Sequence, residues 1–140
     1  MTNVKMNSFE SNDICALVID DNEFQLDFVV DQLNELGINQ VTTANGGRTG
    51  LACFDNMSRK PDLLICDLQM PDMDGFEVMA ALELRKYSGG VILMSGQGAR
   101  VLHSASLVAQ LARQEFLGTI EKPVSKEELC KLIQAMCDRS

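Results

Sequence analysis

The 140-residue chain carries 20 acidic and 12 basic residues, a net charge of −8, and is 46% hydrophobic. This balance is typical of a single globular domain that buries about two-thirds of its unfolded surface, and it argues against a disordered chain. The acidic surplus disfavours nucleic-acid binding, and no apolar run approaches the roughly 20 residues of a membrane span.

The N-terminal segment and the cysteines indicate where the chain works. Residues 1–12 are polar and lack the apolar stretch of a signal peptide, so we expect a loose tail ahead of a domain over 13–140. The five cysteines are widely spread and there is one histidine, which disfavours a zinc site. We interpret the cysteines as small core residues in a reducing compartment, which points to the cytoplasm.

Five apolar runs of strand length alternate with segments of helical spacing. The runs are 14–19, 38–43, 63–66, 91–94 and 116–120. The first has no polar alternation, which suits a parallel strand covered on both faces. Helices are predicted from the apolar positions Phe24, Phe28, Val29, Leu33 and Leu36; Leu51, Ala52, Phe54 and Met57; Phe76, Met79 and Leu82; a long stretch from about 100 to 114; and Leu129, Leu132, Ile133 and Met136. Strict alternation implies a parallel α/β sheet with helices on both faces.

Helix-boundary signals support this division of the chain. Gly37 is placed to end the first helix, and Asp21 or Asn22 could cap its start. Asp74 with Glu77, and Ser125 with Glu128, have capping-box spacing.

Polar and charged side chains follow four of the five strands. Asp20 and Asp21 come after the first, Asp67 after the third, Ser95 after the fourth and Lys122 after the fifth. Ligands of open parallel α/β sheets bind beyond the carboxyl ends of the strands, so these groups should meet at one edge. Clustered carboxylates attract Mg²⁺, a carboxylate can accept a phosphoryl group, and hydroxyl and ammonium groups can hold its oxygens.

Each of these residues taken alone has an ordinary structural explanation. A lone Asp21 is more often a helix cap, by about two to one, and a lone Asp67 or Ser95 is usually a turn residue. Pro123 often marks a helix entry, but the predicted cap at Ser125 leaves Pro123 in the preceding turn, a candidate for a cis peptide bond. Four strand ends that each carry a suitable group favour a phosphoacceptor site.

The sequence resembles the CheY-like receiver domains of two-component response regulators, from about Ile14 to Cys137. The resemblance rests on Val18-Ile19-Asp20-Asp21-Asn22, on Asp67-Leu68-Gln69-Met70-Pro71-Asp72-Met73-Asp74-Gly75, on Ser95 and on Glu121-Lys122-Pro123. It implies a flavodoxin-like, doubly wound sheet of five parallel strands in the order 2-1-3-4-5 with five helices. It also implies that Asp67 is phosphorylated by a histidine kinase or phosphotransfer protein. Asp20, Asp21, Asp67 and the backbone carbonyl of Gln69 would hold Mg²⁺.

Two departures from the family pattern concern the response to phosphorylation. Thr119 stands three residues before Lys122, where many receivers carry Tyr or Phe, which argues against coupling through an aromatic ring. The spacing from Ser95 to Lys122, 122 − 95 = 27 positions, is about one helical turn longer than usual and predicts an enlarged fourth helix. That long helix is similar to receivers joined to cyclic-di-GMP phosphodiesterase (EAL) output domains.

The remaining expectations concern the border of the site and the output. Gln69 and Gln97 should border the site and tune access of water. A homodimer or an output domain is expected to use the face of the fourth helix, fifth strand and fifth helix. We expect a signalling switch rather than an enzyme; a phosphatase of the haloacid-dehalogenase type would want Asp-x-Asp, whereas Asp20 and Asp21 are adjacent. A degenerate receiver that serves only as an interaction module is the alternative.

Overall fold

The computed structural model of the protein describes residues 13–96 and 115–138, which contain five strands and four helices. The elements are β1 (Cys15–Ile19), α1 (Glu23–Glu35), β2 (Gln40–Ala44), α2 (Gly47–Asn56), β3 (Leu63–Asp67), α3 (Gly75–Leu84), β4 (Gly90–Ser95), β5 (Glu115–Glu121) and α5 (Lys126–Asp138). The tail expected over 1–12, the enlarged helix expected near 100–114, and Gln97 lie outside the described residues.

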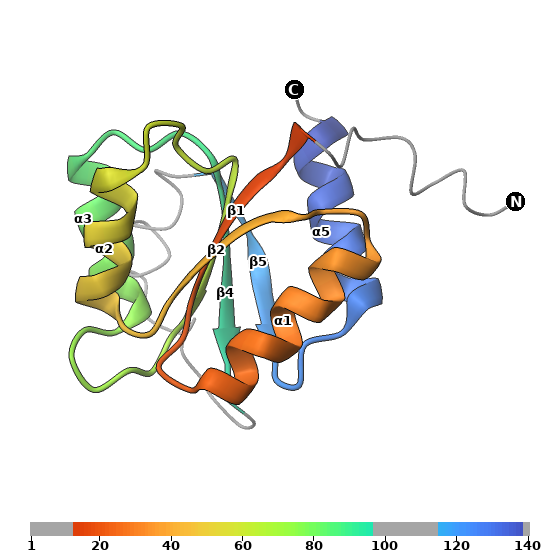
Figure 1. The fold of residues 1–140 in the computed structure, drawn as a ribbon, viewed down its shortest axis with the longest axis horizontal. Coiled ribbons are helices and arrows are strands. Elements are labelled where there is room, and N and C mark those ends of the chain that lie inside the picture. The colour runs from red at the N-terminus through yellow and green to blue at the C-terminus, as the bar shows by residue number, and fades with distance from the viewer. Residues whose placement is uncertain (1–12, 97–114, 139–140) are drawn as a thin grey trace, which may run out of the picture.

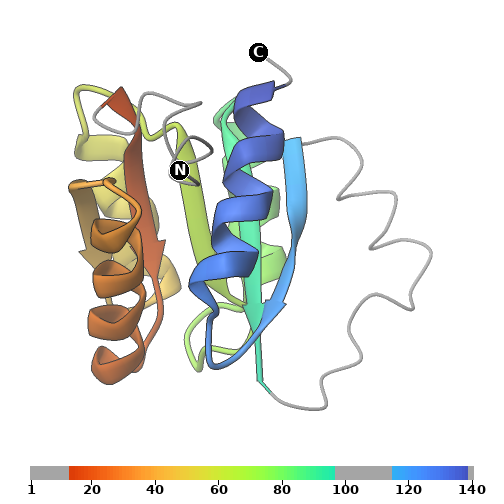
Figure 2. The ribbon, with the colours of Figure 1, turned by 90° about the vertical axis from the view of Figure 1, so that its right-hand side faces the viewer.

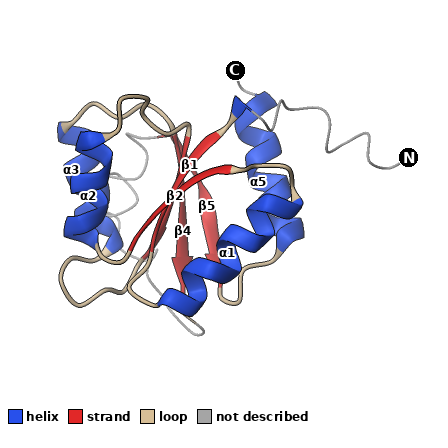
Figure 3. Cartoon of the chain, in the orientation of Figure 1, coloured by secondary structure: helices blue, strands red, loops and turns tan. Residues whose placement is uncertain are grey.

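The five strands form one parallel sheet in the order β2-β1-β3-β4-β5. Figure 3 shows the strands lying together between two groups of helices. All residues of β1, β3 and β4 are buried, as their unbroken apolar runs predict for central strands. The edge strand β2 is largely exposed, which explains its weaker apolar pattern. The predicted doubly wound, flavodoxin-like sheet is therefore confirmed.

Helices cover both faces of the sheet and divide the core into two layers. Figure 1 places α2 and α3 on one side of the strands and α1 and α5 on the other, and α1 and α5 face the viewer in Figure 2. Alternate residues of the central strands point to opposite layers: Val18 and Ile65 pack with α1 and α5, whereas Leu17 and Leu64 pack with α2 and α3. Burial on both faces holds the strand ends, and the groups that follow them, in fixed positions.

The buried face of α1 differs from the sequence-based expectation. Leu26, Val29 and Leu33 face the sheet, whereas Phe24 is 86% exposed and Phe28 is 39% exposed. At about 100° per residue, both phenylalanines lie about 160° around the helix from Leu26. The predicted helix is present, but its apolar positions do not all lie on the buried face, because three-to-four spacing also connects residues on the solvent face.

The helix termini follow the predicted capping chemistry. Asn22 caps α1 by accepting hydrogen bonds from the amides of Phe24 at 2.9 Å and Gln25 at 3.2 Å. Asp74 and Glu77 form the complete capping box of α3. Gly37 follows α1 with a left-handed φ of 91°. Within the described residues no helix has the length and apolar character needed to cross a membrane.

Candidate phosphoacceptor site

Asp20 and Asp21 lie at the carboxyl end of β1, and their surroundings differ. Asp20 is fully buried, and its Oδ1 accepts a hydrogen bond of 2.9 Å from the Asn22 amide. Since Asn22 caps α1, the carboxylate of Asp21 is not used as the helix cap and lies exposed at the sheet edge. Because Asn22 is the cap, the alternative explanation of Asp21 as a helix cap does not apply, and its carboxylate remains available as a metal ligand.

Asp67 ends β3 beside these acids. It is 5% exposed, and one carboxylate oxygen each from Asp20, Asp21 and Asp67 lie within 4.8 Å of one another. The Gln69 amide donates a hydrogen bond to the Asp67 carboxylate. Such mutual proximity of three carboxylates is costly in a partly dry site unless cations lie close by.

Lys122 brings the opposite charge to this cluster. Its Nζ lies 2.9 Å from Asp20 Oδ2 and 3.2 Å from Asp67 Oδ2. The backbone also holds Lys122 in place, because its amide donates to the Ser95 carbonyl oxygen over 2.8 Å. The ammonium thus bridges the two buried carboxylates, and the sequence-based juxtaposition of Asp20, Asp67 and Lys122 is present in the structure.

The electrostatics of the site act on both partners of these ion pairs. Burial raises the pKa of Asp67, the charge of Asp20 raises it further, and Lys122 and the Gln69 amide only partly offset these effects. For Lys122, burial lowers the pKa, but the hydrogen bonds and charges of Asp20 and Asp67 outweigh burial and raise it overall. The Asp67 carboxylate is therefore short of positive charge, whereas the Lys122 ammonium is firmly protonated.

Ser95, Pro123 and Thr119 complete the edge. Ser95 ends β4 and is buried, and the Lys122–Pro123 peptide bond is cis, as the sequence suggested for a tight turn. A register shift between β4 and β5 at Val91/Ile92 precedes Thr119, whose buried Oγ1 has no hydrogen-bond partner among the residues that the structure describes. Thr119 has a small polar side chain in place of an aromatic ring, so a rotating ring at this position cannot couple β5 to the site.

The residues present suit a hard divalent cation. Carboxylate and carbonyl oxygens are the ligands that Mg²⁺ prefers, and the three carboxylates outnumber the Lys122 ammonium that bridges two of them. Asp20, Asp21 and Asp67 can therefore hold such an ion, with the Gln69 carbonyl as the further candidate. The positive charge of the bound ion would offset the repulsion from Asp20, which contributes to the raised pKa of Asp67.

Comparison with known proteins identifies the family. The profile of the response regulator receiver domain matches residues 16–134. The chain belongs to this family. The receiver is 30% identical to the probable chemotaxis protein CheY of Rhizobium etli, over 88% of this chain and 92% of that protein. A solved receiver domain protein from Clostridium thermocellum superposes with a TM-score of 0.75 and 27% identity, covering 90% of this chain and 95% of that one.

Several relatives are longer proteins that contain a receiver. The cyclic di-GMP phosphodiesterase RocR of Pseudomonas aeruginosa is 30% identical over 87% of this chain, which spans 31% of RocR. A protein-glutamate methylesterase of Natronomonas pharaonis matches 48% of this chain, and the match spans 18% of that protein. The receiver domain is therefore the part shared with these relatives, which carry different activities.

The structure also reveals contacts that the sequence pattern did not single out. Asp72 accepts hydrogen bonds from the amides of Gly47 at 3.2 Å and Arg48 at 3.0 Å, at the start of α2. The sequence signal was the absence of a capping side chain at Gly46, the residue before the helix. A partner 25 positions further along the chain cannot be found from local spacing.

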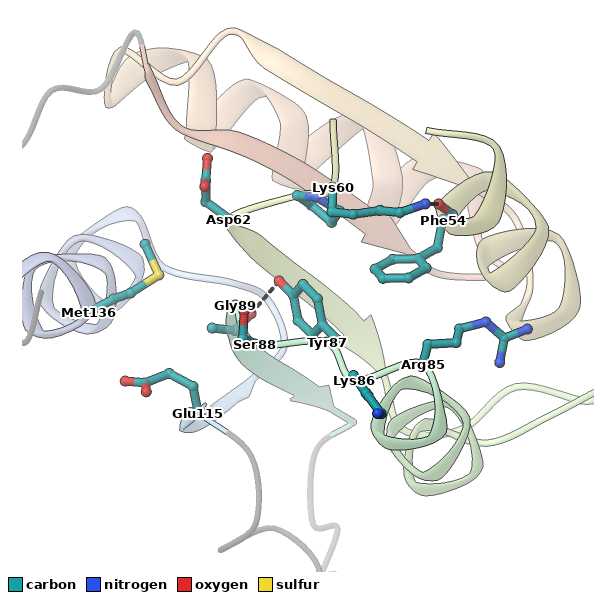
Figure 4. Close-up of a pocket in the computed structure, with 12 residues that line it drawn as sticks. Phe54, Lys60, Asp62, Arg85, Lys86, Tyr87, Ser88, Gly89, Glu115 and Met136 are labelled. Atoms are coloured by element: carbon teal, nitrogen blue, oxygen red, sulfur yellow. Dashed lines mark hydrogen bonds between the residues drawn. The ribbon is translucent and has the colours of Figure 1, made fainter. Parts of the chain in front are cut away.

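A hollow of about 480 Å³ lies at the opposite edge of the sheet, between the amino ends of β3 and β4 and α5 (Figure 4). Lys60 Nζ lies 4.7 Å from the centroid of the Phe54 ring and donates to the Phe54 carbonyl. The Tyr87 hydroxyl donates to the Gly90 carbonyl over 3.2 Å, and Arg85 is paired with Asp55. These polar groups each have their own partner, whereas the carboxylates of Asp20 and Asp67 share the ammonium of Lys122.

Proposed function

We propose that this receiver is a phosphorylation-dependent switch of two-component signalling, with Asp67 as the phosphoacceptor. The observation that carries the proposal is the position of Lys122 Nζ, 3.2 Å from Asp67 and 2.9 Å from Asp20, beside the three clustered carboxylates. A nucleophilic carboxylate, an adjoining acid cluster and a partly buried ammonium together suit phosphoryl transfer, which depends mainly on positioning and charge neutralisation. Membership of the receiver family supports the same reading.

The proposed reaction uses the chain's own groups in distinct roles. A carboxylate oxygen of Asp67 attacks phosphorus and forms the new P–O bond. The bond from phosphorus to the donor breaks; the leaving group is an imidazole that takes up a proton or, with acetyl phosphate, an acetate ion. Lys122 and the Ser95 hydroxyl then hold the phosphoryl oxygens.

Asp20 and Asp21, which follow β1, contribute to the same step by binding positive charge. Bound Mg²⁺, held by Asp20, Asp21, Asp67 and the Gln69 carbonyl, would supply positive charge to the phosphoryl oxygens. Buried Asp20 also keeps Lys122 in place, because the two groups form the shorter of the two ion pairs at 2.9 Å. Phosphorylation would replace the single negative charge of the Asp67 carboxylate with about two on the phosphoryl group, draw Ser95 and Lys122 inward, and shift the balance between two conformations.

The proposed role implies two kinds of partner, a donor of the phosphoryl group and an output. The phosphoryl donor is proposed to be a histidine kinase or a histidine phosphotransfer protein. Similarity to RocR supports a regulated output in cyclic-di-GMP hydrolysis, through an EAL domain in the same protein or a separate one. A homodimer through the fourth helix, β5 and α5 is the alternative; sedimentation with and without beryllofluoride would detect it as a phosphoryl-dependent change in mass.

Mass spectrometry after incubation with Mg²⁺ and acetyl phosphate tests the proposal. We expect the wild-type chain to gain one phosphoryl group, and the gain to disappear in Asp67→Asn. Asp55→Asn is the matched control, because Asp55 pairs with Arg85 away from the site and its loss should leave phosphorylation intact.

Other results would support different functions. Absence of both phosphorylation and beryllofluoride binding would reject the switch and favour an interaction module. Repeated turnover of phosphate esters would favour a phosphatase. Phosphorylation that persists in Asp67→Asn would assign the acceptor to another residue.

A further inference from the structure

The start of α2 is capped by a residue from another loop. Its N-cap residue is Gly46, which has no side chain to offer, and the carboxylate of Asp72 takes that role. Oδ1 of Asp72 accepts from the Gly47 amide at 3.2 Å, and Oδ2 accepts from the Arg48 amide at 3.0 Å. The Arg48 amide is the main reason why the pKa of Asp72 lies below its ordinary value, with further help from the amides of Gly47, Asp72 and Met73.

The packing around these hydrogen bonds leaves no room for a Cβ atom at Gly47 and little room for one at Gly46. A Cβ atom on Gly47 would lie 2.7 Å from Met73 Cβ, and one on Gly46 would lie 3.2 Å from Asp72 Oδ2. Side chains at these positions would push the loop away from α2. The Gly46-Gly47 pair therefore lets the loop tip lie directly against the first amides of the helix.

The loop that carries Asp72 is the segment 68–74 that follows Asp67. Its two ends meet, because the Gly75 amide donates to the Leu68 carbonyl over 2.9 Å. The Asp74–Glu77 capping box joins its last residue to α3. Asp72 supplies the attachment at the tip, so the loop is held to two helices by two different carboxylates.

The same loop sets the surroundings of Asp67. The Gln69 amide donates to the Asp67 carboxylate, and the Gln69 side chain is exposed, whereas its neighbours Leu68 and Met70 are buried. The backbone at Gln69 is therefore held by these two neighbours and by the attachment of the loop tip. Loss of the Asp72 attachment would let the tip move away from α2. The orientation of the Gln69 amide towards Asp67 would then be less well defined.

We propose that Asp72 is a positioning residue for the phosphoacceptor site. By joining the loop tip to the start of α2, it holds the Gln69 backbone in the orientation that Mg²⁺ binding and phosphoryl transfer need. The inference rests on the proposed function of Asp67, and it adds a residue that touches neither the metal nor the phosphoryl group.

The decisive experiment separates positioning from helix capping. Asp72→Ala removes both effects, whereas the double variant Asp72→Ala/Gly46→Ser restores a local cap on α2 without reattaching the loop. Gly46 has an extended backbone that serine adopts readily, and the alanine removes the carboxylate that the new Cβ would approach. Thermal unfolding, Mg²⁺ affinity by calorimetry and the phosphorylation rate with acetyl phosphate are measured for each chain.

We expect Asp72→Ala to lower the midpoint of thermal unfolding. It should also weaken Mg²⁺ binding and slow phosphorylation, each by about tenfold, which is the smallest loss typical of residues that orient metal ligands. The double variant should regain thermal stability but not affinity or rate. Asp72→Asn, which keeps one acceptor oxygen, should lie between the wild type and Asp72→Ala. Recovery of affinity and rate in the double variant, or wild-type values in Asp72→Ala, would overturn the inference.

Hydrogen exchange at the Gln69 amide tests the positioning independently of phosphorylation. Its protection should fall in Asp72→Ala and stay low in the double variant, because the amide loses a fixed orientation towards Asp67. If the wild-type chain neither binds Mg²⁺ nor accepts a phosphoryl group, the proposed function of Asp67 fails. Unchanged protection in Asp72→Ala would instead reject the role of Asp72 alone.

Discussion

The two edges of the sheet contain similar residue types but balance their charges differently. At the amino edge, Asp62 accepts hydrogen bonds from the Cys15 amide at 2.9 Å and from Arg59 at 2.8 Å. Asp55, near that edge, pairs through both oxygens with Arg85. At the carboxyl edge, Lys122 bridges Asp20 and Asp67 while Asp21 adds a third carboxylate.

This difference teaches what distinguishes a structural acid from a candidate functional one. Asp62 and Asp55 each have their own cation, Arg59 and Arg85, so their charges are balanced within the chain. The carboxyl edge has a surplus of buried negative charge, and burial with the charge of Asp20 raises the pKa of Asp67. Such an imbalance is costly in a domain of marginal stability, and a bound cation would offset it.

Removal of Lys122 should have the largest effect on stability. In Lys122→Met the buried carboxylates of Asp20 and Asp67 lose their bridging cation. We expect the free energy of unfolding in EDTA to fall by about 2–3 kcal/mol, below the loss for a fully buried pair because Lys122 is partly exposed. Mg²⁺ should restore more stability to this variant than to the wild type; urea unfolding with and without the ion measures both.

Lys126→Met is the matched control for that change. Lys126 pairs with Glu35 at the surface, where solvent screens the interaction, so its loss should hardly alter unfolding. Equal stability of Lys122→Met and the wild type in EDTA would contradict the charge imbalance inferred for the carboxyl edge.

The sequence predicted the charged groups at the carboxyl edge, but it did not predict the contacts that hold the loops around them. Unbroken apolar runs located the central strands, and the ends of those strands brought Asp20, Asp67 and Lys122 to one edge. These inferences need only local patterns and parallel topology. The roles of Asp62 and Asp72 depend on partners 47 and 25 positions away, and local spacing carries no information about them.

Periodicity alone also failed to give the direction of a helix face. Phe24 and Phe28 are apolar and correctly spaced, yet both lie on the solvent side of α1. The orientation was decided by Leu26, Val29 and Leu33, which contact the sheet. Apolar type and spacing identify a helix, but the competition between two apolar stripes is settled by packing.

One substitution at each edge of the sheet should show that the amino edge contributes to folding stability and the carboxyl edge to Mg²⁺ binding. Asp62→Ala leaves the Cys15 amide without its acceptor and should lower the free energy of unfolding by about 1–2 kcal/mol, with unchanged Mg²⁺ affinity. Asp21→Ala should weaken Mg²⁺ binding and leave unfolding in EDTA unchanged, because Asp21 is exposed. Denaturant titration and calorimetry measure the two quantities; a loss of Mg²⁺ affinity in Asp62→Ala would break the separation.

The pH dependence of stability should differ in sign between the edges. The folded-state pKa of Asp67 is raised, so its contribution to stability is fully present below the unfolded-state pKa and is lost as pH rises through the folded-state value. Arg85 lowers the pKa of Asp55, so that contribution is present above the unfolded-state pKa and is lost as pH falls through the folded-state value. In EDTA, acidification from pH 7 should therefore stabilise the wild type relative to Asp67→Asn.

The control for this pH effect is Asp55→Asn. As pH falls into the range where carboxylates protonate, the wild type should lose its advantage over Asp55→Asn, the reverse of the comparison with Asp67→Asn. Urea midpoints measured at several pH values give both differences. A wild-type advantage over Asp67→Asn that shrinks on acidification would show that Asp67 is stabilised, not strained, by its surroundings.

Thr119 should give the smallest effect, and it defines how far the carboxyl edge extends along β5. Its buried Oγ1 has no hydrogen-bond partner, so Thr119→Val removes a desolvated hydroxyl at nearly constant volume. We expect the free energy of unfolding to rise by up to about 1 kcal/mol in the unphosphorylated chain. If the hydroxyl gains a partner when Asp67 is phosphorylated, the same substitution should give no stabilisation in the beryllofluoride-bound chain. Equal stabilisation in both states would place Thr119 outside the switch and restrict the response to Ser95 and Lys122.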